Sequence, residues 1–261
     1  MTVDEIVVDD AEGIVTITLN RPEMKNAISV AMFEALRDIF RSVTAQQQAR
    51  CVVLTGTRDF AAGADLSRAG SDAPRERPNT MLSMRVIHDA VVALHEIPVP
   101  VIAKVRGVAV GAGMSLALAC DMVLASHNAR FAAIFARRGL SLDCGASWLL
   151  PRLVGIQKAK EIALLAEMFG ADEAKAMGLV NRIVPDDELD AAVAELAVRL
   201  SRGPTLALSM TKRLLNNAFT SSLPEALEAE AMAQGVNSST DDTKEGLLAF
   251  LEKRDASFKG R

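Results

Sequence analysis

The glycine-rich stretch at residues 107–121 limits what this chain can fold into more than any other feature. It follows an apolar, β-branched run at residues 98–105, which predicts a buried strand, and it leads into an Ala- and Leu-rich helix that starts near Gly113. Backbone N–H groups in the first turn of a helix have no partner inside it, and the helix dipole is positive there. Because glycine lets a ligand approach the main chain closely, the stretch predicts an oxyanion site made of backbone.

Other glycine motifs do not fit this stretch. A dinucleotide-binding turn needs a third glycine where Leu116 stands, and a phosphate-binding P-loop needs Lys followed by Ser or Thr. The G-x-S-x-G pattern of a serine nucleophile is also missing. One structural alternative stays open, in which the glycines only let the strand and the helix pack closely.

Composition limits the class of protein. A chain of 261 residues, half of them hydrophobic, can bury one large core. Cys51, Cys120 and Cys144 are too widely spaced for a disulfide framework or a thiolate site, so we expect no metal. The net charge is -4, with one Trp, no Tyr and no long basic block, which argues against nucleic acid as a partner.

The pattern of apolar residues argues against a membrane partner. No apolar run reaches the ~18 residues of a membrane span. The first residues, Met-Thr-Val-Asp-Glu, contain neither a basic region nor an apolar signal core. We therefore expect a soluble, cytoplasmic protein.

The N-terminal part predicts an α/β fold. Residues 6–8 and 14–19 predict a β-hairpin, and residues 51–54 predict a buried strand. Between them, Ser29 can cap a helix whose apolar residues recur at helical spacing as far as Phe40. The order strand, helix, strand predicts a right-handed crossover and a largely parallel sheet covered by helices.

A second turn of small residues comes after that strand. Residues 58–66 contain Gly63 and the acidic Asp65, which can cap the next segment, so this turn also presents backbone N–H groups. Residues 67–80 are polar and charged, and they predict a loop that can act as a lid. A helix is expected at residues 81–94.

The rest of the chain becomes increasingly helical. We expect an α/β core over residues 1–200 and a helical C-terminal region over residues 201–261. That region has too few helices for a core of its own, so it packs on the α/β part or on a neighbouring subunit. The expected elements after residue 121 are apolar segments at 122–125 and 131–135, a strand at 181–184, and helices at 158–168, 171–178, 189–200, 206–218, 223–234 and 242–253.

Six segments in chain order resemble the crotonase superfamily, the enoyl-CoA hydratase/isomerase family. They are residues 19–28 (LNRPEMKNAI), 60–66 (FAAGADL), 107–121 (GVAVGAGMSLALACD), 139–155, 174–181 (AKAMGLVN) and 250–254 (FLEKR). The resemblance implies an α/β fold, a crotonase-like spiral of ββα units with a helical C-terminal trimerisation region. It also implies a homotrimer or a dimer of trimers that acts on acyl-CoA thioesters.

By this resemblance the amides of Ala64 and Ala112 form an oxyanion hole. The hole stabilises the enolate that forms when a thioester loses a proton from the adjacent carbon. Coenzyme A enters as part of the substrate, and no separate cofactor is implied. The residues that the resemblance places at coenzyme A are Lys25, Ala27, Ala62, Asp65, Leu66 and Lys259. For either lysine a solvated surface charge is an equal alternative, and for Asp65 a helix cap explains the residue better than a base does.

The resemblance also narrows the reaction. Hydratases of the family use two glutamates to activate water, but the matching positions hold Ser115 and Phe135, which cannot do a carboxylate's work. Asp143 matches the aspartate with which some isomerases of the family carry a proton between carbons of the acyl chain. A single carboxylate suffices for that shift. The structural alternative is that Asp143 caps the next helix.

Other polar residues carry weaker hypotheses. His88, His95 and His127 show no metal-ligand spacing, so ordinary surface or core roles are expected for them, and Asp121 is expected to be structural. Ser115 has no histidine arranged to make it a nucleophile.

Three functions are compatible with these residues. The first is an enoyl-CoA isomerase with Asp143 as acid and base. The second is a hydratase in which Asp143 alone handles the water, and the third is an acyl-CoA binding protein without catalysis.

Overall fold

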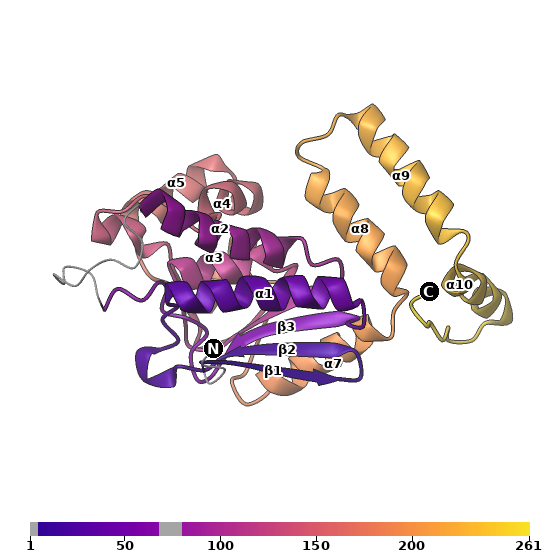
Figure 1. Cartoon of the computed structure of the whole chain (residues 1–261), viewed down its shortest axis with the longest axis horizontal. Coiled ribbons are helices and arrows are strands. Elements are labelled where there is room, and N and C mark those ends of the chain that lie inside the picture. Colours follow the sequence, from indigo (N-terminus) through magenta and orange to yellow (C-terminus); the bar gives the residue numbers. More distant parts are fainter. Residues whose placement is uncertain (1–4, 68–79) are drawn as a thin grey trace.

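A six-stranded sheet forms the centre of the molecule (Figure 1). The computed structural model describes residues 5–67 and 80–261. The strands, in their order along the sheet, are β1 (Ile6–Ala11), β2 (Ile14–Leu19), β3 (Cys51–Gly56), β4 (Val101–Val105), β6 (Met122–Ser126) and β9 (Arg182–Val184). β1 and β2 form an antiparallel hairpin, and the other neighbouring strands are parallel. The predicted hairpin and the largely parallel sheet are confirmed.

Side chains of β3 alternate between two cores on opposite faces of the sheet. Val52 and Leu54 belong to the larger core, together with the buried face of α1 (Val30–Gln46). Cys51 and Val53 belong to the smaller core, together with α7 (Leu189–Ser201). This alternation is the two-residue period of a strand that is covered by helices on both sides.

Helix boundaries agree with local signals. The Ser29 hydroxyl accepts the N–H of Met32 at 3.2 Å and caps α1, as predicted. The helices after α1 are α2 (Thr80–His95), α3 (Ala112–Ala119), α4 (Ala146–Val154), α5 (Ile156–Leu165) and α6 (Ala171–Ala176), with short 3-10 helices η2 (Pro22–Met24) and η3 (Ile134–Arg138). α5 ends before the predicted residue 168, because Ala166 adopts left-handed backbone (φ 50).

A second sheet of three short strands was not predicted. It consists of β5 (Val108–Val110), β7 (Arg130–Ala132) and β8 (Phe169–Gly170), in the order β5-β7-β8. β5 lies in the part of the glycine-rich stretch before Gly113, which the sequence predicted to be a turn. Three residues between glycines give no local strand signal, because the pairing partners lie more than twenty residues away.

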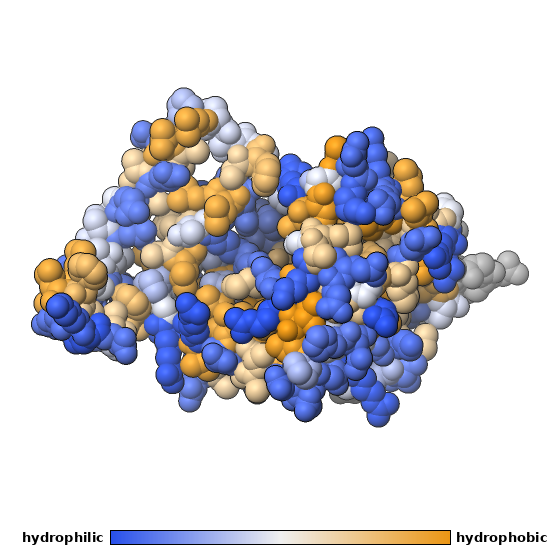
Figure 2. All heavy atoms as spheres, turned by 180° about the vertical axis from the view of Figure 1, so that it is seen from behind, coloured by the Kyte–Doolittle hydropathy of each residue, from blue (hydrophilic) through white to orange (hydrophobic). Residues whose placement is uncertain are grey.

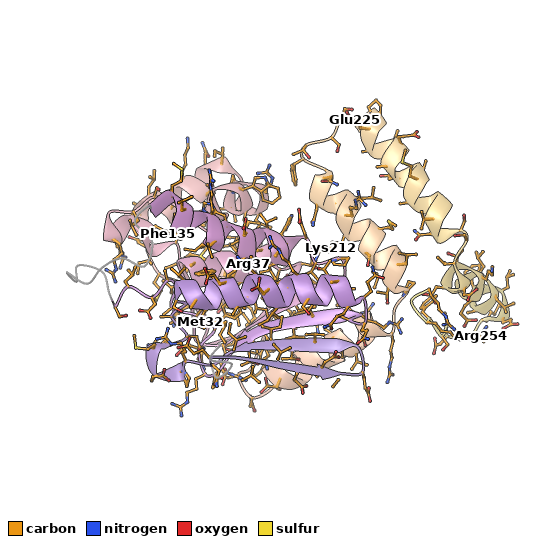
Figure 3. All side chains as sticks on the ribbon, viewed as in Figure 1. Met32, Arg37, Phe135, Lys212, Glu225 and Arg254 are labelled. Atoms are coloured by element: carbon orange, nitrogen blue, oxygen red, sulfur yellow. The ribbon has the colours of Figure 1, made fainter. Side chains whose placement is uncertain are left out.

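The last three helices project away from the sheet (Figure 1). They are α8 (Thr205–Asn217), α9 (Leu223–Asn237) and α10 (Asp241–Glu252). Lys212 of α8 points to the core (Figure 3), and its ammonium lies 2.7 Å from the Asp121 carboxylate. Asp121 also accepts the N–H of Val101 at 2.7 Å, which confirms its structural role.

Two further expectations concern the lid and the boundary between core and C-terminal region. The predicted lid falls almost entirely on residues 68–79, outside the described residues. The boundary near residue 200 stays a prediction. Within the described part of the chain, each helix is too short or too polar to cross a bilayer.

Candidate active site

The two predicted turns lie side by side in the structure. The turn at residues 58–66 is the first of the two along the chain and is called the first turn from here on. Its Ala61 forms a parallel β-bridge with Ala109 of β5, which lies in the glycine-rich stretch. The Ala61 N–H donates to the Val108 carbonyl at 2.9 Å, and the Val110 N–H donates to the Ala61 carbonyl at 3.0 Å. Main-chain hydrogen bonds therefore bring together two segments that lie far apart in the sequence.

Glycines allow this close approach. A Cβ on Gly113 would collide with the carbonyl oxygen of Ala61. A Cβ on Gly63, whose φ is 101, would lie 2.9 Å from the Val110 carbonyl oxygen and 3.6 Å from the Ala112 nitrogen. Close packing, the alternative left open by the sequence, is thus real. It is also what brings the first turn against the start of α3.

The N–H of Ala64 faces away from the chain that pairs with it. Ile28 donates its N–H to the Gly63 carbonyl at 2.8 Å and accepts the N–H of Asp65 at 2.9 Å. Ala64 lies between these two bonds, and its own N–H meets no acceptor among the described residues. This group is available to a ligand.

The N–H of Ala112 also has no acceptor among the described residues, although Ala112 itself is buried. The first bond inside α3 runs from the Ser115 N–H to the Gly111 carbonyl, at 3.0 Å. Ala112 precedes that bond as the first residue of the helix, and its N–H meets no acceptor in the described part of the chain. Two donors from adjacent turns can hydrogen-bond one oxygen, as an oxyanion hole requires.

Asp143 lies on the loop between η3 and α4. Its Oδ1 accepts the N–H of Cys144 at 2.5 Å and lies 3.2 Å from Nε2 of His88. The N-cap of α4 is Gly145, and no side chain caps this helix. The interpretation of Asp143 as a helix cap is therefore wrong.

Ser115 links the oxyanion turn to the loop of Asp143. Its side chain is buried, with 1% of the residue exposed, and its Oγ lies 3.2 Å from the Gly111 carbonyl oxygen and 3.3 Å from that of Asp143. Ser115 stands one helical turn after Ala112. It therefore holds the main chain of Asp143 near the second oxyanion donor.

The apolar ring of Phe135 lies beside Gly111, next to the start of α3. It lies on η3, is buried, and its Cζ is 4.0 Å from the position of a Cβ on Gly111. Neither Ser115 nor Phe135 supplies an ionisable group. The contact of Ser115 with the Asp143 main chain brings the Asp143 carboxylate to this region, in addition to the Asp65 carboxylate in the first turn itself.

The three histidines have different surroundings. His88 was expected to play an ordinary surface or core role, but the structure places it against the Asp143 carboxylate. No local signal could reveal this contact, since 55 positions separate the two residues. His95 packs edge-on against Trp148 with ring centroids 5.3 Å apart, and burial lowers its pKa. His127 is exposed.

Predicted coenzyme A contacts gather beside the first turn. The Ala62 N–H donates to the Lys25 carbonyl at 2.8 Å, which places the exposed Lys25 at the rim of this turn. Ala27 is half-buried next to the Ile28 bridge, and Leu66 is exposed after Asp65.

Asp65 is held in place by hydrogen bonds. Its Oδ1 accepts the N–H of Ser67 at 2.9 Å, and its Oδ2 accepts from Arg21 at 3.0 Å. The Ser67 N–H, then the Ser67 hydroxyl and the Arg21 guanidinium, hold the pKa of Asp65 below its usual value. Any helix that Asp65 caps would lie in residues 68–79, outside the described residues.

Lys259 is not brought to this site within one chain. Its N–H donates to Asp242, and the next residue, Gly260, lies against Thr205 and Arg50. Arg50 precedes β3, whereas the turn of Ala64 lies beyond the other end of this six-residue strand, ~20 Å away. In Figure 3, Phe135 and Arg254, a residue of the C-terminal segment, lie toward opposite ends of the molecule.

Thiols and metal ligands do not build a second site here. Cys51, Cys120 and Cys144 are buried, and burial raises the pKa of each thiol, to about 12 for Cys51. Within residues 5–67 and 80–261, no three His, Cys, Asp or Glu side chains gather as a metal ion would require.

Two cavities border α2 and α4 without containing the turns. The larger, about 920 Å³, separates α8 from the core and is lined by His95, Trp148 and Lys212 among others. The smaller, about 300 Å³, is mainly apolar and lies between α2 and α4, where Gly145 and Leu149 line it. Gly145, which lines the smaller cavity, is two positions after Asp143 in the chain.

Comparisons with known proteins agree with one another. Residues 9–261 match the family model described as Enoyl-CoA hydratase/isomerase. The "Probable enoyl-CoA hydratase" of Rhodobacter capsulatus is 40% identical over 253 residues, with 96% of each chain covered. The "1,2-epoxyphenylacetyl-CoA isomerase" of Escherichia coli is 37% identical over 252 residues, again with 96% of each chain covered. The crystal structure of enoyl-CoA hydratase from Bacillus anthracis superposes with a TM-score of 0.92 at 33% identity, covering 98% of this chain and 100% of that one.

Proposed function

Because the chain belongs to the enoyl-CoA hydratase/isomerase family, we propose that it shifts a double bond of an enoyl-CoA thioester through an enolate. The proposed direction is from 3-enoyl-CoA to 2-enoyl-CoA. The family supports the acyl-CoA substrate, and the choice of isomerisation comes from the residues at the site.

The two turns suit the enolate. When a proton leaves the carbon next to the thioester carbonyl, negative charge develops on the carbonyl oxygen. The N–H groups of Ala64 and Ala112 donate to that oxygen and stabilise the enolate more than the neutral thioester. Removing one such donor typically costs ~10²-fold or more in rate.

Asp143 carries the proton in this proposal. Its Oδ1 is occupied by two donors, whereas Oδ2 has no hydrogen bond among the described residues. Oδ2 removes a proton from the carbon between the carbonyl and the double bond, and then returns it to the far carbon of the former double bond. One proton leaves and one returns, so the carboxylate is regenerated without a second acid.

One observation carries this choice. The positions that match the glutamates of family hydratases hold Ser115 and Phe135, and the buried Ser115 hydroxyl lies against two main-chain carbonyls. Neither of these two positions therefore supplies a carboxylate that could activate water.

Hydration is the second candidate. The R. capsulatus relative at 40% identity and the B. anthracis neighbour are both named as hydratases. In this alternative Asp143 alone activates the water. The E. coli relative, whose name describes an isomerase, supports the first candidate.

The proposal also includes the residues that bind coenzyme A. Lys25, Ala27, Ala62, Asp65 and Leu66 contact coenzyme A at the rim of the first turn, where Lys25 offers its charge to a phosphate. Binding through Lys259 requires a second copy of the chain, because that residue lies at the other end of the strands.

A homotrimer or a dimer of trimers is the proposed assembly. Apolar side chains are exposed on α8, α9 and α10, among them Leu215, Leu223 and Phe250, and Figure 2 shows apolar surface on these helices. A second copy can cover this surface. The cytoplasmic location stays a prediction.

The proposed reaction is tested by product analysis. The protein is incubated with 2-enoyl, 3-enoyl and dienoyl CoA thioesters, and the products are identified by mass and chromatography. Isomerisation leaves the mass unchanged, whereas hydration adds one water. Formation of 3-hydroxyacyl-CoA as the main product would overturn the proposal, and thermal stabilisation by acyl-CoA without any turnover would indicate a binding protein.

A further inference from the structure

His88 and the Asp143 carboxylate meet across two elements that are far apart in the sequence. His88 lies on α2, and its Nε2 is 3.2 Å from Oδ1 of Asp143. Val91, about one helical turn later on α2, lies near Gly145, because a Cβ on Gly145 would lie 3.4 Å from Cγ1 of Val91. One face of α2 therefore lies along residues 143–145.

The Asp143 carboxylate is held on one side only. Oδ1 meets the Cys144 N–H and His88, while Oδ2 meets no donor among the described residues. Rotation about the bond to a carboxyl group is broad and weakly restrained. Two donors on one oxygen restrict this rotation and decide which oxygen is presented.

The backbone that follows Asp143 has an unusual conformation. Cys144 has a φ of 52 and Gly145 a φ of 79, so two consecutive residues adopt left-handed backbone after Asp143. Such conformations are costly for a residue with a Cβ and persist where the surroundings impose them. The Cys144 N–H belongs to this backbone, and the substitution that would remove it, to proline, does not fit this φ.

His88 contributes little to folding by comparison. Its side chain is 54% exposed, and an exposed pair of this kind adds little to stability. An arrangement that gains little for the fold, yet restrains the carboxylate that moves the proton, suits a role in catalysis.

We propose that His88 is a positioning residue for the double-bond shift: it donates its Nε2–H to Oδ1 of Asp143 and thereby presents Oδ2 to the substrate. This inference rests on the proposed function of Asp143. Nothing in the chain's local pattern marks His88, whose role arises from the packing of α2 on the loop.

Kinetics of three variants test the inference. His88→Ala removes the donor, His88→Gln keeps an N–H at the same distance from the main chain, and His127→Ala removes an exposed histidine elsewhere. In isomerisation of 3-enoyl-CoA we expect His88→Ala to lower kcat ~10- to 100-fold with KM within about twofold, because a misplaced reacting group costs rate without costing binding. His88→Gln recovers most of the rate, and His127→Ala matches the wild type.

Two outcomes would overturn the inference. One is a His88→Ala protein with wild-type kcat, and the other is a His88→Gln protein as slow as His88→Ala. Melting temperatures of all variants are measured alongside, and they are expected to match the wild type. A slow and also unstable His88→Ala protein would count against a positioning role.

A measurement without substrate separates this inference from the proposed reaction. Nitrogen-15 spectra of the histidine rings at pH 8.5 report which ring nitrogen carries the hydrogen. We expect His88 to be protonated at Nε2 and to shift toward a mixture of tautomers in Asp143→Ala, with His127 unchanged. If the nitrogen-15 signals of His88 are the same in Asp143→Ala and in the wild type, the contact is refuted. If the wild type does not isomerise the substrate, the proposed function is refuted instead.

Discussion

Ser115 bears on the reaction in two ways: it removes an acid that a hydratase needs, and it helps to position the loop of Asp143. It stands where a hydratase of the family carries an acid, and it uses its hydroxyl to tie the Asp143 loop to α3. A hydroxyl cannot activate water as a carboxylate does. It can instead keep the remaining carboxylate in place.

Ser115→Ala should therefore loosen the site without abolishing the reaction. Loss of one buried hydrogen bond costs about 0.5 to 1.5 kcal/mol of unfolding free energy. An effect of that size lowers kcat by roughly tenfold at most. Urea unfolding and steady-state kinetics measure both. A thousandfold loss of kcat at unchanged stability would show that the hydroxyl takes part in the chemistry.

The first turn depends on Asp65, which the sequence analysis explained as a helix cap and placed, by resemblance, at coenzyme A. Asp65 bonds the Ser67 N–H and Arg21, and these bonds hold its pKa below the usual value. A carboxylate whose pKa is lowered by folding stabilises the fold above its unfolded pKa, and this contribution is lost as the pH falls through the folded pKa.

Asp65→Asn should consequently destabilise the protein in a pH-dependent way. Both partners are mostly buried, so we expect a loss of about 1 to 3 kcal/mol at pH 7. The difference from the wild type should be complete above pH ~5 and shrink below pH ~4. Urea unfolding at pH 7, 5 and 3.5 gives the profile. Equal stability of the two proteins at pH 7 would contradict it.

At the scale of elements, the oxyanion hole is a property of two packed segments. Gly113 on α3 touches the main chain at Ala61, and no side chain fits between them. Gly113→Ala should separate the two turns. We expect a loss of about 1 to 3 kcal/mol in stability and of ~10²-fold in kcat, the cost of one oxyanion donor.

A matched control is available for that substitution. Gly235 on α9 is also helical, and a Cβ there meets nothing within 4 Å. Gly235→Ala should leave kcat unchanged. If Gly113→Ala keeps the wild-type kcat, the close approach of the two turns is not needed for the reaction.

Much of this element scale could be predicted from the sequence. Buried strands, the Ser29 cap and both small-residue turns gave local signals, and the structure has them where they were expected. The three-residue β5 and the contact between His88 and Asp143 gave none. Each depends on partners far along the chain, and such pairing appears only when the fold is assembled.

At the scale of the whole molecule, the C-terminal helices leave apolar surface uncovered. Phe250 is 82% exposed on α10, Phe219 is exposed between α8 and α9, and Leu223 is exposed at the start of α9. Burial in a second copy would remove this surface from water. Light scattering after gel filtration should give three or six times the chain mass. A monomer at micromolar concentration would contradict the proposed assembly.

The central claim is that Asp143 is the acid and base of a double-bond shift at a backbone oxyanion hole. The most direct measurement compares wild type and Asp143→Asn on 3-enoyl-CoA, with product mass and acyl-CoA binding recorded for both. We predict 2-enoyl-CoA of unchanged mass from the wild type, and a rate at least ~10³-fold lower for Asp143→Asn with binding retained. Full activity of Asp143→Asn would contradict the claim.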